Sequence, residues 1–425
     1  MVRPDFGSAL PDSSPPRLLF IAPWFLFPTV SGGRIRTVDV LRGMRGRHFH
    51  ITLLQPRPPE GEDAYRAELE RVCDEAIFWD DDTKRSRLRR ITSLASRLPV
   101  SVALDRSASA RAVIDTALAA QPDVVVVDFV HTAIVCPERF DAPSLVFTHN
   151  VESEIYARHA ERATRATMRA IWKSQAEKMR RFERDVLARF DRVIAVSERD
   201  AATFRRDFAI ERTRTIPTGV DVDFHGFSEH VRSGDLRAQA PRFVFTGSMN
   251  WLPNIEGLEW FLAACWPRIV RECPEASLTV IGRDPDAGLV EAVRRVGANW
   301  KFTGFVDDVR PEIHGGDISI IPLRIGGGTR LKAFEAMALG SPLVSTTLGV
   351  EGLPVEHEVH CTVADGDEGF AKACIEMARD GEHRASLRAS ARRFVEAQFS
   401  STAVARVFEG LCIEAMDERL ARSTR

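Results

Sequence analysis

The stretch Ile320–Leu353 reads IIPLRIGGGTRLKAFEAMALGSPLVSTTLGVEGL. An apolar strand pattern runs into three consecutive glycines, which are followed by Arg330, Lys332 and, on a short helical pattern, Glu335. Glycines let the backbone approach an anion without a Cβ in the way, and the next helix offers unpaired N–H groups and the positive end of its dipole. The stretch therefore predicts a phosphate-binding loop between a strand and a helix of an α/β domain.

The loop between this strand and helix contains more glycine than a turn requires. A plain strand-to-helix turn needs one glycine, whereas Gly326–Gly328 supplies three, followed by Thr329 and two cations. Ligands of open α/β sheets bind beyond the carboxyl ends of the strands, so a phosphate-binding role is favoured over a simple turn. Glu335 is either a surface partner of Lys332, worth under about 1 kcal/mol, or a carboxylate of the site. The apolar run Ala336–Ala338 buries the helix and favours the site.

Length and composition indicate an ordinary globular protein with two domains. The chain has 425 residues, which suits two domains of about 200 residues each and implies a cleft between them. Its hydrophobic content of 44% and net charge of −2 give no reason to expect nucleic acid as a partner. The seven cysteines show no CxxC spacing, so neither a disulfide framework nor a zinc site is indicated, and a reducing cytoplasm fits best.

The first residues of the chain do not have the pattern of a secretion signal. Residues 1–16 contain acids and prolines where a signal peptide needs an apolar core, so we predict a disordered leader. The run Leu18–Phe27 is apolar but is interrupted by Pro23, and it is well short of the roughly 20 residues that a membrane span requires. We expect a buried strand there.

Two sets of apolar runs predict two α/β domains. Continuous hydrophobicity marks strands that are covered on both faces, as in a parallel sheet. The first set predicts a domain over residues 17–221 and the second a domain over residues 242–395, with a hinge over residues 222–241. The strands of the first set are Leu18–Ala22, Ile51–Leu54, Val124–Val127, Leu145–Thr148 and Val193–Val196, and those of the second are Phe243–Thr246, Leu278–Ile281, Ile318–Pro322 and Pro342–Ser345.

Helical spacing of apolar residues separates the strands of the second set. The predicted helices are Glu256–Val270, Ala287–Val296 and Leu331–Leu339. The same spacing continues from Arg384 onward, and we expect helices over residues 396–425 to close one or both domains. The predicted fold class is α/β, with two doubly wound parallel sheets.

Glycine and polar residues also follow the strands of the first domain. Gly32 and Gly33 lie between the first strand and a predicted helix, which is a weak signal alone because their spacing differs from GxGxxG. His149 ends a strand, and a lone histidine is more often a structural hydrogen-bonding group than a catalytic one. Its place at the carboxyl end of a strand favours a functional role, and the structural and functional interpretations both remain open. Asp128 and His131 lie similarly with less support.

Two basic stretches have helical patterns. Lys84–Leu98 combines five arginines with four apolar residues, which is typical of a helix on an anionic membrane surface. A solvated helix face above a core stripe explains the same pattern, so membrane contact is one of two interpretations. Ala157–Arg192 has a similar pattern, which we interpret mainly as core packing.

In this order, the features resemble the retaining glycosyltransferases of family 4, which have the GT-B fold of two facing Rossmann-like domains with a cleft between them. The resemblance covers the chain from about Arg17 to Phe399. It depends on the ordered set of marks more than on any single one. The marks are Ser31-Gly32-Gly33, Thr148-His149-Asn150, Ile216-Pro217-Thr218-Gly219-Val220-Asp221, Phe245-Thr246-Gly247, Ile281-Gly282, Thr303-Gly304-Phe305-Val306-Asp307, and Gly328 through Pro342.

The resemblance implies a role for each candidate residue. Glu335 would bind the ribose hydroxyls of a nucleotide, the backbone around Phe305 and Val306 would hold the base, and His149 would face the transferred sugar. The loop residues that would contact the donor are Gly32, Gly33, Gly247, Gly327, Gly328 and Thr329. Such enzymes need neither a metal nor a cofactor, so protein donors stabilise the leaving diphosphate, each worth about 3 kcal/mol in a dry cleft.

The chain departs from the family pattern at two places. The family has two glutamates eight positions apart, and the position eight before Glu335 is Gly327, so the carboxylate expected to orient the donor sugar is missing. Family members also carry an Arg and a Lys after the first strand of the second domain, where this chain has Gly247–Asn254 without a cation. We therefore predict that Arg330 and Lys332 supply the neutralising charge.

The predicted function is transfer of a sugar, with retention, from a nucleotide-diphosphate donor to a glycan or lipid-linked acceptor in cell-surface polysaccharide synthesis. We expect a cytoplasmic enzyme, for which peripheral contact with the inner membrane face through Lys84–Leu98 is one of the two interpretations of that stretch. Two alternatives remain: a sugar-nucleotide epimerase or hydrolase of the same architecture, and a non-catalytic protein that binds sugar nucleotides.

Overall fold

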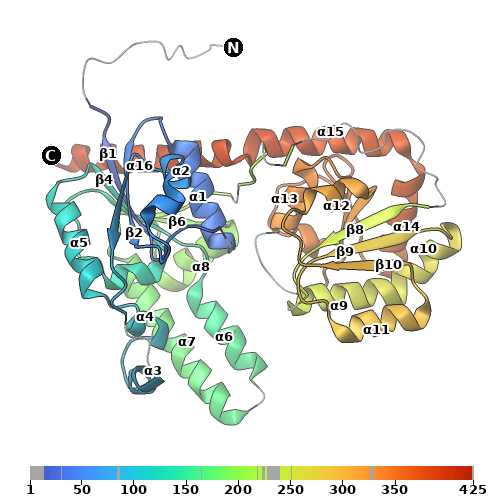
Figure 1. Ribbon diagram of the computed structural model, residues 1–425, viewed down its shortest axis with the longest axis horizontal. Coiled ribbons are helices and arrows are strands. Elements are labelled where there is room, and N and C mark those ends of the chain that lie inside the picture. Colours follow the sequence, from blue (N-terminus) through green and yellow to red (C-terminus); the bar gives the residue numbers. More distant parts are fainter. Residues whose placement is uncertain are drawn as a thin grey trace. The chain divides into compact units, whose positions relative to one another are not determined.

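The computed structural model describes residues 14–29, 31–83, 87–163, 165–217, 219–222, 225–226, 240–249, 251–325 and 330–423. Within it the chain divides into two compact units (Figure 1). The first unit comprises Met1–Ile216 with Ala405–Arg425, and the second comprises Pro217–Val404. Most of the predicted leader, most of the predicted hinge and Gly326–Thr329 lie outside the described residues.

The first unit is built on a seven-stranded, fully parallel sheet. Its strand order is β3-β2-β1-β4-β5-β6-β7. The next two strands along the chain are added on one side of β1 and the later ones on its other side, so the strand order reverses between β1 and β4. The strands are β1 (Arg17–Ile21), β2 (His50–Pro56), β3 (Glu75–Trp79), β4 (Val124–Asp128), β5 (Ser144–Phe147), β6 (Arg192–Ala195) and β7 (Thr213–Thr215).

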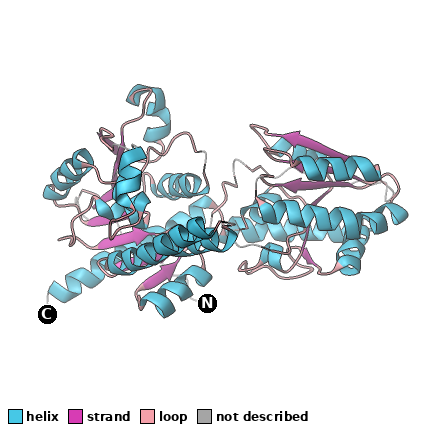
Figure 2. Cartoon of the chain, turned by 90° about the horizontal axis from the view of Figure 1, so that it is seen from below, coloured by secondary structure: helices cyan, strands magenta, loops and turns pink. Residues whose placement is uncertain are grey.

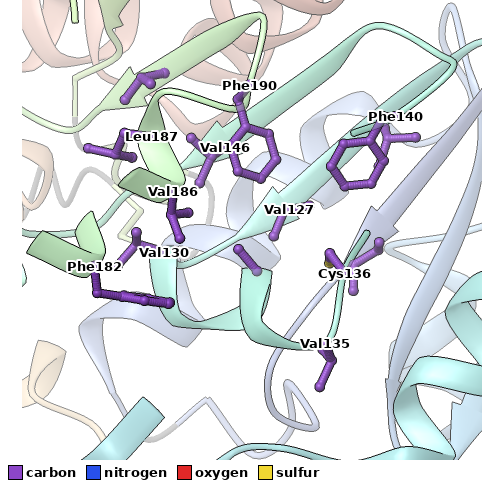
Figure 3. Packing of buried hydrophobic residues seen from close by; sticks show 14 of the residues in the cluster. Val127, Val130, Val135, Cys136, Phe140, Val146, Phe182, Val186, Leu187 and Phe190 are labelled. Carbon is purple, nitrogen blue, oxygen red and sulfur yellow. The ribbon is translucent and has the colours of Figure 1, made fainter. Parts of the chain in front are cut away.

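Helices cover both faces of this sheet (Figure 2). In Figure 3, Phe182, Val186 and Leu187 of one long helix pack with Val127 and Val146 of the sheet. On the opposite face, Phe147 meets Phe408 at 5.2 Å between ring centroids. The helices of the unit are α1 (Gly32–Met44), α2 (Arg66–Glu70), α3 (Arg87–Ser93), α4 (Val100–Leu104), α5 (Ala108–Ala119), α6 (Glu152–Arg162), α7 (Ala166–Leu187) and α8 (Glu198–Phe208), with short turns η1 (Glu62–Tyr65) and η2 (Val130–Ile134).

The second unit repeats this plan with six parallel strands in the order β10-β9-β8-β11-β12-β13. Alternate residues of β8 show why both faces need helices, since Phe243 and Phe245 join one buried cluster and Val244 joins another. The strands are β8 (Arg242–Thr246), β9 (Ser277–Ile281), β10 (Trp300–Gly304), β11 (Ile318–Ile321), β12 (Leu343–Ser345) and β13 (Thr362–Val363).

The helices of the second unit lie on both faces of its sheet (Figure 1). One predicted helix is divided: the stretch predicted as Glu256–Val270 forms α9 and α10 with a π-helical turn, η3, between them. The elements are α9 (Leu252–Trp260), η3 (Phe261–Cys265), α10 (Trp266–Glu272), α11 (Ala287–Val296), α12 (Arg310–Gly315), α13 (Leu331–Ala338), η4 (Leu348–Val350), α14 (Asp367–Arg379) and α15 (Gly381–Gln398).

The chain ends in α16 (Ser401–Ser423), whose residues from Ala405 belong to the first unit. There Glu409 is buried and accepts hydrogen bonds from Arg47 Nε at 3.0 Å and from the His48 amide at 3.1 Å. The helices predicted from Arg384 onward are confirmed, and their apolar positions, including Phe394 and Phe408, are buried.

The helix predicted over Lys84–Leu98 was wrong in extent. Among the described residues, α3 ends at Ser93 and tight i to i−3 hydrogen bonds follow it. The Ser96 hydroxyl accepts a hydrogen bond from the Leu98 amide at 3.0 Å, and Pro99 disfavours helical geometry at the residue before it. For Ala157–Arg192, core packing is confirmed by residues such as Met179 and Phe182.

Four short strands were not predicted, namely β3, β7, β10 and β13. β3 and β10 lie at sheet edges next to a single neighbour, and their residues are mostly half-buried. An edge strand needs no continuous apolar run because one of its sides is open to water. In the part of the chain that the structure describes, no helix is both long and apolar enough to cross a membrane.

Candidate functional site

A group of polar residues in the second unit lies where β8 and β11, neighbours in the sheet, both end. This is the point at which strand order reverses, and such points are the usual ligand sites of doubly wound sheets. Lys332 of α13 donates from Nζ to Asn254 Oδ1 at 2.7 Å, and Nζ lies 4.4 Å from the centroid of the Phe245 ring. A Cβ on Gly247 would lie 3.0 Å from Lys332 Nζ and 2.6 Å from Asn254 Nδ2, so a larger residue here would displace the Asn254 side chain that holds Lys332.

The ammonium group of Lys332 is held in an environment that disfavours its charge. Burial lowers the pKa of Lys332 to about 7, Arg330 adds to the lowering, and Glu335 counteracts it. An anion that binds beside such a lysine favours the charged form and so raises the pKa of the lysine. The environment of Lys332 therefore favours an anionic ligand.

Arg330 precedes α13 in a left-handed backbone conformation, with φ of 52°. Its side chain is only 4% exposed, and Nη2 donates to Glu351 Oε2 at 3.2 Å. The Nε atom is buried and has no hydrogen-bond partner among the described residues. Burial lowers the pKa of the guanidinium although Glu351 opposes the shift. A buried donor without a partner costs free energy of folding. Arg330 therefore gains from an anion that accepts a hydrogen bond from Nε.

Glu335 lies one helical turn after Lys332 on the same helix. Burial raises the pKa of its carboxyl group, and the charges of His225 and Lys332 act in the opposite direction. A carboxyl group in this position accepts hydrogen bonds from ligand hydroxyls when ionised.

Phe305 and Val306 follow the edge strand β10 and differ in their surroundings. Phe305 is 68% exposed, with the Arg283 guanidinium 5.8 Å from its ring centroid. Val306 packs against the buried residues Ile281 and Ile313. An exposed ring beside a guanidinium offers a stacking surface for a planar group, which the sequence did not indicate.

A second polar group lies in the first unit, at the ends of the neighbouring strands β4 and β5. His149 is buried, with Nε2 2.6 Å from Asp128 Oδ1 and Nδ1 3.1 Å from Arg36 Nη1. Since Arg36 can only donate, this network assigns the proton to Nε2, which donates to Asp128. Burial lowers the pKa of His149, and Arg36 lowers it further while Asp128 raises it. The imidazole is therefore held neutral and in one orientation.

Phe129 covers the imidazole of His149, with ring centroids 3.9 Å apart and an interplanar angle of 13°. Its backbone has φ of 61° and ψ of 140°, a region occupied almost only by glycine. A Cβ on Gly33 would lie 2.5 Å from Phe129 Cζ, so the ring fits only because residue 33 is glycine. Gly32, the first residue of α1, is exposed.

The structure thus brings most predicted site residues into two groups. One group belongs to the second unit and contains Gly247, Arg330, Lys332 and Glu335. The other belongs to the first unit and contains Gly33 and His149. Gly327, Gly328 and Thr329 lie outside the described residues. The contact of His149 with a sugar remains a prediction, since only 1% of its side chain is exposed.

Several partners of these residues were not predicted from sequence, among them Asn254, Glu351 and Arg36. Each is far along the chain from the residue it contacts, so no local pattern marks it. Asp128 carried a weak signal as a polar residue at a strand end. Within the described ranges, no group of three or more His, Cys, Asp or Glu residues is placed to hold a metal ion.

Two family models match the chain. The model described as Glycosyltransferase Family 4 matches residues 30–224, and the model described as Glycosyl transferases group 1 matches residues 240–380. Together they account for most of both units.

Curated relatives match shorter parts of the chain. An uncharacterized 44.6 kDa protein in the cps region of Klebsiella pneumoniae is 26% identical over 168 residues, which is 38% of this chain and 43% of that protein. The phosphatidyl-myo-inositol mannosyltransferase of Mycobacterium tuberculosis H37Rv is 28% identical over 135 residues, 31% of this chain and 34% of that enzyme. The matched part of the chain thus spans less than half the length of these relatives.

Solved structures share the fold over almost the whole chain. A sucrose-phosphate synthase from Thermosynechococcus elongatus has a TM-score of 0.65 at 18% identity, covering 96% of this chain and 100% of that one. Anabaena HepE in complex with UDP and glucose has a TM-score of 0.61 at 16% identity, covering 93% and 98%. With the two parallel sheets, these similarities confirm the predicted GT-B fold.

The lowered pKa of Lys332 gives the unfolding free energy a characteristic pH dependence. Between pH 7 and 10.5 the unfolded chain binds a proton at Lys332 that the folded chain has lost, so the burial cost is present in full below pH 7 and is relieved as pH rises. We expect the stability difference between wild type and Lys332→Met to shift in favour of wild type across this range, measured by urea unfolding. A difference that does not change with pH would contradict the buried environment of Lys332.

Proposed function

Because the chain belongs to family 4 of the glycosyltransferases, we propose that it transfers a sugar from a nucleotide-diphosphate donor to a glycan or lipid-linked acceptor. The observation that carries this proposal is the pair of cations in the second unit, of which Arg330 is buried and Lys332 is half-buried. Arg330 has a buried Nε without a partner in the described part of the chain, and Lys332 has a pKa lowered to about 7. A diphosphate supplies negative charge beside two cations whose protein partners compensate their positive charge only in part.

The leaving group sets the chemical demand on these two residues. Cleavage of the bond between sugar and diphosphate leaves negative charge on the phosphate oxygens, which needs donors that are already oriented. We assign that role to the Arg330 guanidinium and the Lys332 ammonium. Arg330 is fixed by Glu351 and Lys332 by Asn254, so neither side chain needs to be ordered when the donor binds.

The nucleoside would lie beyond the diphosphate on the same unit. Glu335 accepts hydrogen bonds from the ribose hydroxyls, and the exposed ring of Phe305 with Arg283 offers a surface for the base. Anabaena HepE, a protein of the same fold, was solved with UDP and glucose, which supports a nucleotide as ligand.

The relatives indicate a biological setting. One lies in a cps region and another is named a mannosyltransferase acting on phosphatidyl-myo-inositol. We propose that this protein acts in cell-surface polysaccharide or glycolipid synthesis, with retention at the anomeric carbon as in its family. The coupling constant of the anomeric proton in the product, measured by NMR, distinguishes retention from inversion.

Gly327 favours a second candidate function, since the carboxylate that orients the donor sugar in the family is absent. A protein of this kind would bind the donor without transferring its sugar, or would hydrolyse or epimerise it. Nucleotide release that depends on an acceptor supports transfer. Consumption of the donor without an acceptor product selects hydrolysis or epimerisation, and tight binding without turnover selects a non-catalytic binding protein.

Replacement of Arg330 tests the proposed role of the cations. We expect Arg330→Ala to lower turnover of a nucleotide-diphosphate sugar by about 100- to 1,000-fold, as for loss of one preorganised donor. Its effect on the midpoint of thermal unfolding should be small, because it also removes a buried cation. Nucleotide release with acceptor is the measurement.

Arg388 provides a matched control in the same unit. It is also buried, and its Nε donates to the Gly340 carbonyl at 2.6 Å. Arg388→Ala should lower stability while turnover per folded molecule is retained. Unchanged turnover in Arg330→Ala, or an equal loss in both variants, would contradict the assignment.

We also infer that α3 and the turn after it contact an anionic membrane surface. Ile91 and Leu94 are 57% and 40% exposed, and Arg89, Arg90 and Arg97 supply the complementary charge. Ile91→Ser with Leu94→Ser should reduce cosedimentation with vesicles containing phosphatidylglycerol, with no effect on nucleotide binding. Equal cosedimentation of variant and wild type, or of neutral and anionic vesicles, would contradict this inference.

A further inference from the structure

A buried glutamate of the first unit has had no role in the proposed reaction so far. Glu183 of α7 is only 1% exposed. Its carboxylate accepts hydrogen bonds from two backbone amides of another helix, at Oε1 from Glu152 (2.6 Å) and at Oε2 from Ser153 (2.9 Å). These two residues begin α6, directly after the loop Thr148–Val151 that follows β5. We infer that Glu183 is a positioning residue, which holds this loop in the geometry that sugar transfer requires. The inference rests on the proposed function.

Glu183 lies on the side of α7 that faces the core. Its neighbours Met179, Phe182 and Val186 belong to the buried apolar cluster of the first unit, as Figure 3 shows for Phe182 and Val186. A charge among apolar groups is unfavourable, and burial raises the pKa of Glu183 to about 8. The groups of α6 that counteract this shift are the Ser153 hydroxyl and the two amides. The carboxylate is therefore unfavourable for the core, and what it offers in return is its hold on α6.

This hold fixes the start of α6 from outside the helix. Val151, the residue before α6, provides no side-chain hydrogen bond to the first amides of the helix. A serine or aspartate at that position would satisfy one amide locally. Glu183 satisfies two amides and also ties α6 to α7. The loop after β5 is thus held by the sheet at one end and by Glu183 at the other.

The loop carries two polar side chains of different exposure. The side chain of His149 is 1% exposed, whereas Asn150 is exposed. Burial raises the pKa of Glu152, and a hydrogen bond with the Asn150 side chain lowers it. Movement of the first turn of α6 would therefore displace Asn150 together with His149. A displacement of about 1 Å near the reacting groups can cost on the order of 100-fold in rate.

The hold on both amides is complete only when Glu183 is ionised. Protonation places a hydrogen on one oxygen, which then acts as a donor, so one of the two amides loses its acceptor. Other titratable groups surround Glu183. On α6, Glu152 raises the pKa of Glu183 by its negative charge, and Tyr156 lies within the influence of Glu183 and Asp105. The turn η2, which packs against α7, carries His131. Both hydrogen bonds should therefore be completed as pH rises through about 8.

Glu183→Gln tests the inference because glutamine keeps the shape of the side chain but has one acceptor oxygen, like the protonated acid. Turnover per folded molecule, measured as acceptor-dependent nucleotide release, should fall by about 10-fold or more at pH 9 and by less than about 3-fold at pH 6.5. The ratio of wild-type to variant turnover removes the contribution of groups such as Lys332, which titrate in both proteins. Glu183→Asp, which keeps a carboxylate at shorter reach, should restore part of the turnover at pH 9 and provides the same test if Glu183→Gln does not fold.

Stability should change with pH in the opposite direction. Between pH 4.5 and about 8 the folded chain retains a proton at Glu183 that the unfolded chain has lost. The unfolding free energy of wild type should therefore fall relative to that of Glu183→Gln as pH rises through this range, measured by urea unfolding. A residue that served folding alone would not raise turnover over the pH range in which it lowers stability.

Hydrogen exchange tests the hold of Glu183 on the loop without any substrate. Exchange in the peptide of residues 148–156, followed by mass spectrometry at pH 8, should be faster in Glu183→Gln than in wild type. Glu409→Gln is the matched control, because Glu409 is also buried in the first unit and accepts a hydrogen bond from the His48 amide at 3.1 Å. This control should lose stability while turnover per folded molecule and exchange of the peptide stay as in wild type.

Three results would overturn the inference: equal turnover of wild type and Glu183→Gln at pH 9, a turnover ratio that does not change with pH, or an equal loss of turnover in Glu409→Gln. Unchanged exchange in the peptide of residues 148–156 would also overturn it. The thermal shift produced by UDP and GDP is measured in parallel and should be the same in every variant. If neither nucleotide shifts the wild type and no nucleotide is released from a donor, the proposed function fails, and the inference fails with it.

Discussion

The second unit depends on keeping two cations close together in a mostly buried position at the end of β11. Neither has its charge fully compensated: Arg330 pairs with Glu351, a residue that is 60% exposed, and Lys332 is held by the Asn254 amide and the Phe245 ring. Burial of charge without a full counterion is unfavourable, and it shows in the lowered pKa of both side chains. The fold bears this cost because helix α13 is fixed by its apolar face, including Phe334 and Met337, which are fully buried. A site with this property gains most from a ligand of high negative charge.

The first unit shows the opposite electrostatic arrangement. His149 has a hydrogen-bond partner on each nitrogen and is kept neutral, so it offers shape and orientation more than charge. The glycine at position 33 makes room for Phe129, and the Phe129 ring in turn packs edge-on against Trp24. Gly33 of α1 and the unfavourable backbone conformation of Phe129 after β4 thus belong to one packing arrangement. The two units thus differ in charge, with two incompletely compensated cations in the second and a neutral imidazole in the first.

Central strands were predictable because their signals are local. Val124–Val127 is continuously apolar since both faces of β4 are covered, and the helix over Ala287–Val296 was predicted with its observed bounds because its apolar spacing is regular. Edge strands such as β10 were missed because half-exposed strands carry mixed residues. The partners that fix the site were missed for another reason. Asn254 lies 78 residues from Lys332 in sequence, and only the close approach of β8 and β11 joins them.

We propose that the second unit binds a nucleotide through its diphosphate. Isothermal titration of the protein with UDP, UMP, GDP and GMP in the presence of EDTA tests it most directly. We predict that at least one diphosphate binds more than about 10-fold tighter than its monophosphate, a difference of about 1.4 kcal/mol, because Arg330 and Lys332 act on the additional phosphate. Equal affinities for diphosphate and monophosphate, or no binding of any of the four, would contradict the account.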